Sequence, residues 1–164
     1  MKAVTIKEIS RELLNLTPKE IRDLCLRLSR FKKENKELLT YLLFESSDEA
    51  SYIESVKKEI DKQIEQVNRQ SYYYIKKGLR KILLNTRKYI RFSQNKKTEI
   101  DLLIYYCTKL KKFEPSIQNN VALRNLYIRL IETIRENIGS LHEDWQFDYG
   151  PELKALSWNK IIKE

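Results

Sequence analysis

The sequence has little of what turns and catalytic sites need. Its 164 residues include three glycines, three prolines, two cysteines and one histidine. Turn-dense β-folds and nucleotide-binding folds built on glycine-rich loops are therefore disfavoured. Two cysteines without a CxxC motif are too few for a disulfide framework. We expect Cys25 and Cys107 to be buried free thiols in a reducing compartment.

Long apolar runs are also missing. No segment has the uninterrupted apolar length that a membrane span needs, and the first eight residues lack the apolar core of a signal peptide. We therefore expect a cytoplasmic protein with no integral membrane association.

Residues for catalysis are scarce. His142 is the only histidine and lies in a polar segment, so we expect it at the surface. A metal site would need carboxylates alone, and a Ser–His or Cys–His pair would have to include His142. The chain has no Glu-x-x-His pair and no Walker glycine loop. We expect no enzyme activity, no metal and no cofactor.

Signals for helices are abundant. Thr5 with Glu8, and Thr17 with Glu20, form capping boxes, and Thr98 begins another helix with acids in its first turn. Gly139 is placed to end a long helix, and a proline is placed to open a terminal one. The pattern predicts helices over 5–15, 18–32, 35–45, 48–69, 71–92, 98–113 and 120–138, and a last helix opened by Pro151 that carries Leu153, Leu156 and Ile161.

These helices predict one all-α domain over residues 1–164, with seven or eight antiparallel helices. Its form is an irregular bundle or a short HEAT-like α-solenoid. A faint internal repeat supports the solenoid, because a shift of 61 positions aligns Ile21 with Ile82 and Phe31 with Phe92. Two amphipathic hairpins can also align in this way by periodicity alone, so both forms stay open.

The run ISRELLNLTPKEI from Ile9 to Ile21, followed by Leu24 and Leu28, resembles the start of uncharacterised bacterial all-helical families of unknown function. The resemblance covers the first quarter of the chain and consists of helix-cap chemistry. It implies a helical fold, and it assigns no role to any residue because such families have no established activity.

The charge is unevenly distributed along the chain. Between Gln66 and Thr98 there are ten Lys and Arg residues and no Asp or Glu. Residues 69–112 hold 13 bases and two acids, a local net charge of +11, whereas the whole chain has +9. All of the excess positive charge therefore belongs to this stretch, which solubility alone does not require.

On a helix over 71–92, apolar residues such as Ile75, Leu79 and Ile82 share the face that must point to the core. Gly78 at the edge of this face predicts a close helix crossing or a kink. Leu84 falls among the bases of the opposite face. That face also carries one tyrosine and seven bases, which we call the basic stripe: Tyr73, Lys76, Lys77, Arg80, Lys81, Arg87, Lys88 and Arg91.

The basic stripe has several explanations. The stripe could pair with Glu54, Glu59, Asp61 and Glu65 of the preceding helix, which would be an antiparallel neighbour. It could instead bind an acidic protein partner, an anionic membrane surface, or nucleic acid through cations on phosphates and a stacked ring. No nucleic-acid-binding sequence signature is present.

We expect a non-enzymatic intracellular helical scaffold that binds an acidic protein partner through this helix, with RNA or DNA binding as the alternative. Trp145 and Trp158 are expected to pin the C-terminal segment across the end of the bundle. Self-association stays open.

Overall fold

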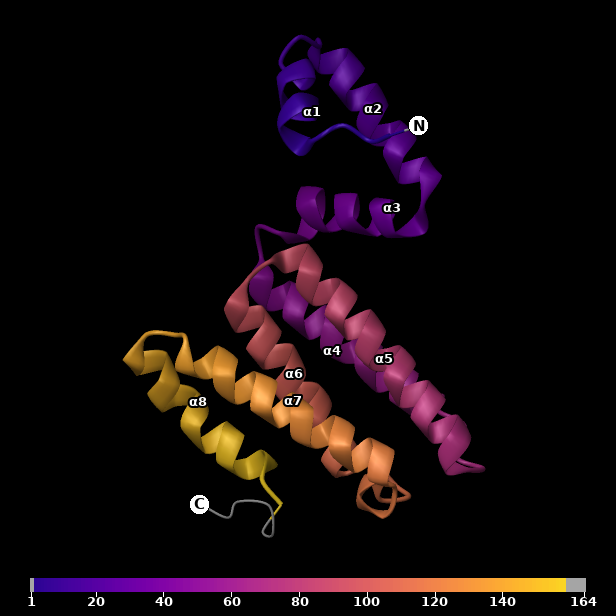
Figure 1. The fold of residues 1–164 in the computed structure, drawn as a ribbon, viewed down its shortest axis with the longest axis vertical. Helices are drawn as coiled ribbons and strands as arrows, with labels where there is room; N and C mark the ends of the chain where they lie inside the picture. Colours follow the sequence, from indigo (N-terminus) through magenta and orange to yellow (C-terminus); the bar gives the residue numbers. More distant parts are fainter. Residues whose placement is uncertain (1, 159–164) are drawn as a thin grey trace. The chain divides into compact units, whose positions relative to one another are not determined.

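The regular structure of the described residues is helical throughout. A computed structural model describes residues 2–158, which contain eight α-helices, one π-helical turn and one 3-10 turn, with no strand among them (Figure 1). The prediction of an all-α protein is confirmed. The contacts divide the chain into two compact units, unit 1 (Met1–Glu45) and unit 2 (Ser46–Glu164). The expectation of a single domain stays a prediction.

Unit 1 holds three short helices and a π-helical turn: α1 (Ile6–Leu13), α2 (Pro18–Phe31), α3 (Lys33–Thr40) and η1 (Tyr41–Glu45). Both predicted capping boxes are present. The Thr5 backbone N–H donates to Glu8 Oε2 at 2.8 Å, and the Glu8 N–H donates back to Thr5 Oγ1 at 3.3 Å. Thr17 and Glu20 repeat this pair with the same distances. The two caps fix where α1 and α2 begin.

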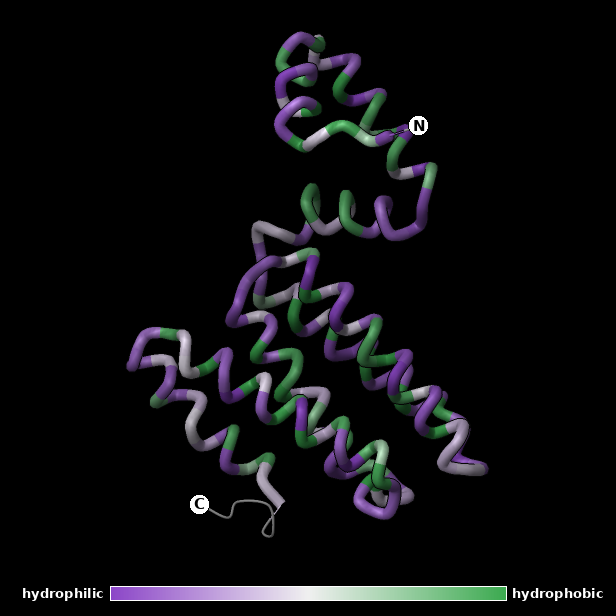
Figure 2. The backbone as a smooth tube through the Cα atoms, in the orientation of Figure 1, coloured by the Kyte–Doolittle hydropathy of each residue, from purple (hydrophilic) through white to green (hydrophobic). Residues whose placement is uncertain are grey.

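Unit 2 is an antiparallel bundle around one central helix. Its helices are α4 (Glu49–Glu65), α5 (Tyr72–Ser93), α6 (Lys96–Lys111), α7 (Val121–Gly139) and α8 (Glu143–Leu156), with the 3-10 turn η2 (Ile117–Asn119) before α7. Helix α6 packs on α4, α5, α7 and α8 and has eight buried residues. Green apolar positions recur along every helix of this unit, as the periodicity predicts (Figure 2).

The start of α6 differs from the prediction. The helix begins at Lys96 with Asn95 as its N-cap, because Asn95 Oδ1 accepts the N–H of Lys97 at 2.9 Å. Thr98, predicted to start the helix, is fully buried and donates from Oγ1 to Glu49 Oε1 at 2.5 Å. Ser93 also donates to Glu49. Glu49 therefore joins the start of α4 to the connection between α5 and α6.

The C-terminal helix also differs. Helix α8 begins at Glu143 with His142 as its exposed N-cap, so Pro151 lies inside the helix and does not open it. The acids of the first turn favour this earlier start. Gly139 is the last residue of α7, and Ser140 forms the C-cap with a negative φ, so the predicted glycine cap is wrong. Ile161 lies outside the described residues.

Tyrosine hydroxyls join the helices of unit 2. The Tyr106 hydroxyl donates to the Leu79 carbonyl at 2.8 Å and ties α6 to α5, and the Tyr149 hydroxyl donates to Asp101 Oδ1 at 2.7 Å and ties α8 to α6. Such bonds satisfy buried hydroxyls while the rings fill the core. Four further hydroxyls make corresponding bonds between segments of this unit: Tyr52, Tyr72, Tyr105 and Tyr127.

The two segments of the internal repeat have different environments. Phe92 is 7% exposed inside unit 2, whereas Phe31, which aligns with it, is 76% exposed. Ile82 is 3% exposed and Ile21 is 38% exposed. The matching sequence pattern therefore gives a buried face in one unit and an open face in the other.

Candidate interaction surface on helix α5

Helix α5 packs on the rest of unit 2 through one of its faces. Ile75, Leu79, Ile82 and Leu83 are each at most 5% exposed, and the helix packs on α4 and α6. The helix ends where Gln94 takes a left-handed conformation, φ 53°, with its N–H bonded to the Ile90 carbonyl. The predicted core face is thus confirmed, and it fixes which side of α5 points outward.

Gly78 marks a close approach. A Cβ atom added at this position would lie 3.1 Å from Cγ1 and 3.3 Å from Cγ2 of Val67, which is buried directly after α4. The predicted close approach is therefore present, but its partner is the α4–α5 connection and not a crossing helix, and the missing side chain lets this connection pack against α5.

The basic stripe lies on the outward face. Its exposed members are Tyr73, Lys77, Arg80, Lys81, Arg87 and Arg91, and its partly exposed members are Lys76 and Lys88. Tyr73 is 63% exposed and meets Tyr74 edge to face at 5.3 Å between ring centroids. From Tyr73 to Arg91 the stripe runs along roughly 27 Å of helix, at 1.5 Å of rise per residue. The structure thus brings all eight predicted residues onto one side of α5.

The four acids of α4 that were predicted to pair with the basic stripe do not pair with its first four bases. Glu54 is 2.8 Å from Lys57 of its own helix, and Glu59 accepts a hydrogen bond from Gln63 at 2.7 Å. Glu65 is exposed. Within residues 2–158, no carboxylate forms an ion pair with Lys76, Lys77, Arg80 or Lys81. The interpretation that α4 pairs with this part of the stripe is therefore wrong.

Asp61, the fourth of these acids, faces α6 instead. Its Oδ1 lies 2.7 Å from Lys109 Nζ, and its Oδ2 accepts the Tyr105 hydroxyl at 2.6 Å. Partial burial raises the pKa of the Asp61 carboxyl, but hydrogen bonds from Lys109 and Tyr105 outweigh this and hold the pKa below its ordinary value. The hydrogen bond that Lys109 donates to Asp61 also raises the pKa of Lys109. This pair fastens α4 to the central helix.

Other bases of the 69–112 stretch also serve the fold. Arg69 lies over the Phe113 ring at 4.8 Å and Lys97 over the Trp145 ring at 3.1 Å, which are cation–π distances. Lys111 donates to two backbone carbonyls at the end of α8, that of Ala155 at 2.7 Å and that of Ser157 at 3.1 Å. The stretch therefore separates into bases that hold helices together and bases of the stripe that face outward.

Leu84 is a part of this surface that the charge pattern alone does not single out. It lies between Arg80 and Arg87 on the same face and is 65% exposed. An open hollow continues past the end of the stripe, lined by Ile90, Arg91, Gln94, Asn95, Lys96 and Glu99. The surface thus combines cations with an exposed apolar side chain.

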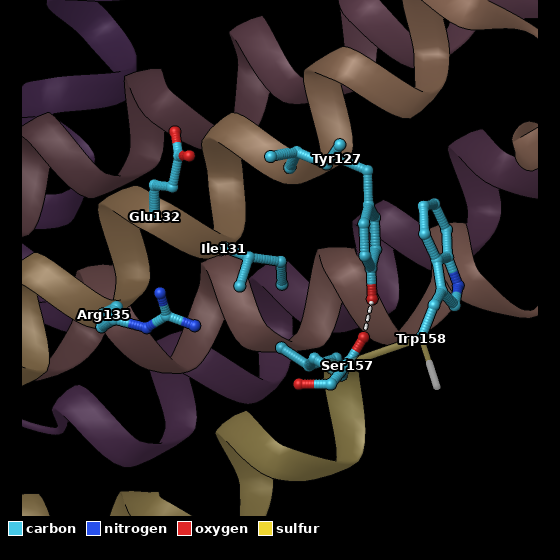
Figure 3. Close-up of a pocket in the computed structure, with 8 residues that line it drawn as sticks. Tyr127, Ile131, Glu132, Arg135, Ser157 and Trp158 are labelled. Carbon is cyan, nitrogen blue, oxygen red and sulfur yellow. Dashed lines mark hydrogen bonds between the residues drawn. The ribbon is translucent and has the colours of Figure 1, made fainter. Parts of the chain in front are cut away.

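A second hollow lies between α7 and the end of α8 (Figure 3). Tyr127 stacks on Trp158 with centroids 4.3 Å apart and donates to the Leu156 carbonyl at 2.7 Å. The hollow holds about 110 Å³, whereas small-molecule sites usually have ~300–1,000 Å³. Trp158, 8% exposed, thus pins the segment after α8 as predicted, whereas Trp145 is 42% exposed.

Three features bear on chemistry at other sites. Cys107 is fully buried, and burial raises the pKa of its thiol to about 12. Cys25 is only partly buried, which corrects the prediction for that residue. In the described part of the chain, no three His, Cys, Asp or Glu side chains are grouped to hold a metal ion, and no helix is long and apolar enough to cross a membrane.

Comparison with known proteins gives no relative. No family model, no curated protein and no solved structure matches the chain. Its function must therefore be inferred from its surfaces.

Proposed function

We propose that this chain is a non-enzymatic helical scaffold that binds an acidic segment of a partner protein along the outward face of α5. The observation that supports the proposal is the exposed Leu84 between Arg80 and Arg87, in a stripe whose bases Lys76, Lys77, Arg80 and Lys81 have no ion pair among the described residues. Phosphate recognition needs cations alone, whereas a protein segment offers both carboxylates and an apolar side chain. Its two free thiols fit a cytoplasmic location.

The spacing of the exposed residues along α5 suits a helical partner. Tyr73, Lys77, Arg80, Leu84 and Arg87 recur every three or four residues, so they form one line on the helix. An acidic amphipathic helix lying along α5 would place its carboxylates against these bases and an apolar residue on Leu84. Burying Leu84 would add about 1 kcal/mol to the binding free energy that the charges supply, which is a roughly fivefold gain in affinity.

Nucleic acid is the second candidate, and Tyr73 is the observation that favours it. Its ring is 63% exposed beside Lys76 and Lys77, an arrangement that suits stacking on an unpaired base while cations contact phosphates. This candidate needs no contribution from Leu84, and that difference separates the two.

The test is a binding titration of the full chain by fluorescence anisotropy. The labelled probes are a helical Glu/Leu peptide, a helical Glu/Gln peptide of equal charge, and single- and double-stranded RNA and DNA. Reversing Arg80 and Arg87 to Glu should weaken binding of the Glu/Leu peptide at least tenfold. Arg124→Glu with Arg129→Glu is the matched control, because both arginines are exposed on α7 and the change in charge is identical. The control should stay within twofold.

Leu84→Ser then distinguishes the candidates. It should weaken binding of the Glu/Leu peptide about fivefold and leave binding of the Glu/Gln peptide unchanged. Binding of RNA or DNA with a salt slope of several phosphates, insensitive to Leu84→Ser, would replace the protein partner by nucleic acid. Peptide binding that survives the Arg80 and Arg87 reversal would refute the assigned surface.

A further inference from the structure

Helix α8 is the most acidic helix among the described residues. It holds four acids and one base, a net charge of −3. These residues are Glu143, Asp144, Asp148, Glu152 and Lys154. Helix α4, with five acids and three bases, comes next at −2. Helix α5 is the opposite extreme, because it holds seven bases and no acid. Unit 2 therefore has strongly opposed charges on two of its own helices.

The acids of α8 are not used by the fold. The helix packs on unit 2 through Tyr149 and Leu156, which are buried, whereas all four acids are exposed. Within residues 2–158, no lysine or arginine forms an ion pair with any of the four. Asp144 has only the adjacent His142, whose Nδ1 lies 3.3 Å from its carboxylate. The negative charge of α8 is thus available to another molecule.

An exposed aromatic ring lies among these acids. Asp144, Phe147, Asp148 and Pro151 are spaced by three, one and three residues, so they share one face of α8. Phe147 is 83% exposed and Leu84 of α5 is 65% exposed, which are the two largest values for large apolar side chains described in unit 2. Both faces therefore present one apolar side chain among charges of a single sign, and the two signs are opposite.

We infer that the acidic segment bound by the basic stripe is α8 of a second copy of this chain. The inference rests on the proposed function and names its partner. Phe147 of one copy would lie against Leu84 of the other, and the acids near Phe147 would face the bases of the stripe. Opposite charges guide the two faces together, and the contact between the apolar side chains excludes water at the centre. Helix α8 is thus the kind of acidic helix with an apolar residue that the stripe suits.

The two faces belong to different sides of the same copy. Helices α5 and α8 each pack on α6 and lie on different sides of unit 2 (Figure 1). The acids of α8 therefore do not reach the stripe of their own chain. Each copy would bind one neighbour through α5 and another through α8, which is a heterologous, head-to-tail contact. Contacts of this kind add further copies, so we expect association to continue past the dimer.

Sedimentation velocity of the full chain tests for this self-association. At low salt the weight-average sedimentation coefficient should rise with protein concentration past the value of a dimer. Association should weaken about tenfold in about 1 M NaCl, because salt screens exposed charges. A chain that is monomeric at every concentration, or that stops at the dimer, would overturn the inference. Binding of the Glu/Leu peptide by a monomeric chain would leave the proposed function intact with another protein as partner, whereas loss of peptide binding would refute that function as well.

Phe147→Ser tests the α8 face, and Phe31→Ser is its matched control. The two rings are 83% and 76% exposed, and Phe31 lies at the end of α2 in unit 1. Phe147→Ser should weaken self-association about tenfold and leave binding of the Glu/Leu peptide unchanged, because the stripe is intact. Phe31→Ser should change both by less than about twofold. Equal effects of the two substitutions would indicate non-specific apolar association and overturn the inference.

Two variants that fail alone should associate when they are mixed. Arg80→Glu with Arg87→Glu disables the stripe and keeps α8, whereas Phe147→Ser with Asp148→Asn disables the α8 face and keeps the stripe. Each variant alone should associate about tenfold more weakly than the wild type. An equimolar mixture should recover the wild-type affinity and stop at the heterodimer, because one competent stripe and one competent α8 face remain. A mixture that stays as weak as its components would exclude contact between α5 and α8.

Discussion

Gly78 offers a test of how closely α5 packs against the α4–α5 connection. Replacing glycine by alanine inside a helix normally stabilises it by about 1 kcal/mol. Here the new methyl would lie 3.1 Å and 3.3 Å from the two γ-methyls of Val67, closer than ordinary van der Waals contact. Val67 is 8% exposed, so it has little space into which to move. Overpacking of this kind costs about 1–3 kcal/mol, and we expect Gly78→Ala to be neutral or destabilising by up to ~2 kcal/mol.

A double-mutant cycle isolates this contact. Val67→Ala removes both γ-methyls, so in that background Gly78→Ala should recover its helix-propensity gain of about 1 kcal/mol. The coupling energy between the two positions should therefore be about 1–3 kcal/mol, typical of residues in direct contact. Urea unfolding followed by far-UV circular dichroism measures all four free energies, and equal m-values verify that the unfolded state is unchanged.

The refuting result is also clear. If Gly78→Ala stabilises the wild type and the Val67→Ala variant equally, the coupling is zero, and close approach of Val67 is not the reason for glycine at this position. Stripe-dependent binding should be unchanged in Gly78→Ala at temperatures where the protein is folded, because Gly78 lies beside the core face of α5.

Three more measurements probe the bundle of unit 2. Asp61→Asn should reduce the stability of the protein at neutral pH. Because the pKa of Asp61 lies below its ordinary 3.8, the stability advantage of the wild type should disappear as the pH falls from about 4 through that lowered pKa. Thermal unfolding at several pH values measures this loss. Tyr106→Phe should cost about 1 kcal/mol in urea unfolding, because it removes the fully buried hydroxyl bond to Leu79. In Cys25→Ser, Cys107 should react with a thiol reagent only on unfolding, since burial raises its pKa to about 12; rapid native labelling would contradict the buried placement.

Local signals predict the helices well because the chemistry that decides them is local. The capping boxes at Thr5 and Thr17 act within one turn, and the two faces of α5 follow from its helical period alone. The start of α6 shows where this fails. Asn95 and Thr98 are both competent caps, and burial of Thr98 against Glu49, far away in the sequence, decides between them.

The partners of charged residues depend on tertiary register, which no local pattern contains. Asp61 is close in sequence to the basic stripe, yet it faces Lys109 because α4 contacts α6 as well as α5. The same limit applies to exposure. Ile21 and Ile82 have equivalent positions in similar amphipathic patterns, but Ile82 is 3% exposed and Ile21 is 38% exposed. Periodicity identifies a face that needs a partner and does not say whether the chain supplies one.

The way unit 2 is held together explains why its cations remain available. Tyrosine hydroxyls make many of its bonds between helices, and these bonds use carbonyl and carboxylate acceptors without any cation. The bases that do take part, such as Lys109 and Lys111, lie on α6 and bond to groups of α4 and α8. Lys77, Arg80 and Lys81 instead lie on the outward face of α5, where the fold gives them no described ion pair. Replacing Lys77, Arg80 and Lys81 should thus leave the stability of unit 2 nearly unchanged, which is what distinguishes a binding surface from a structural one.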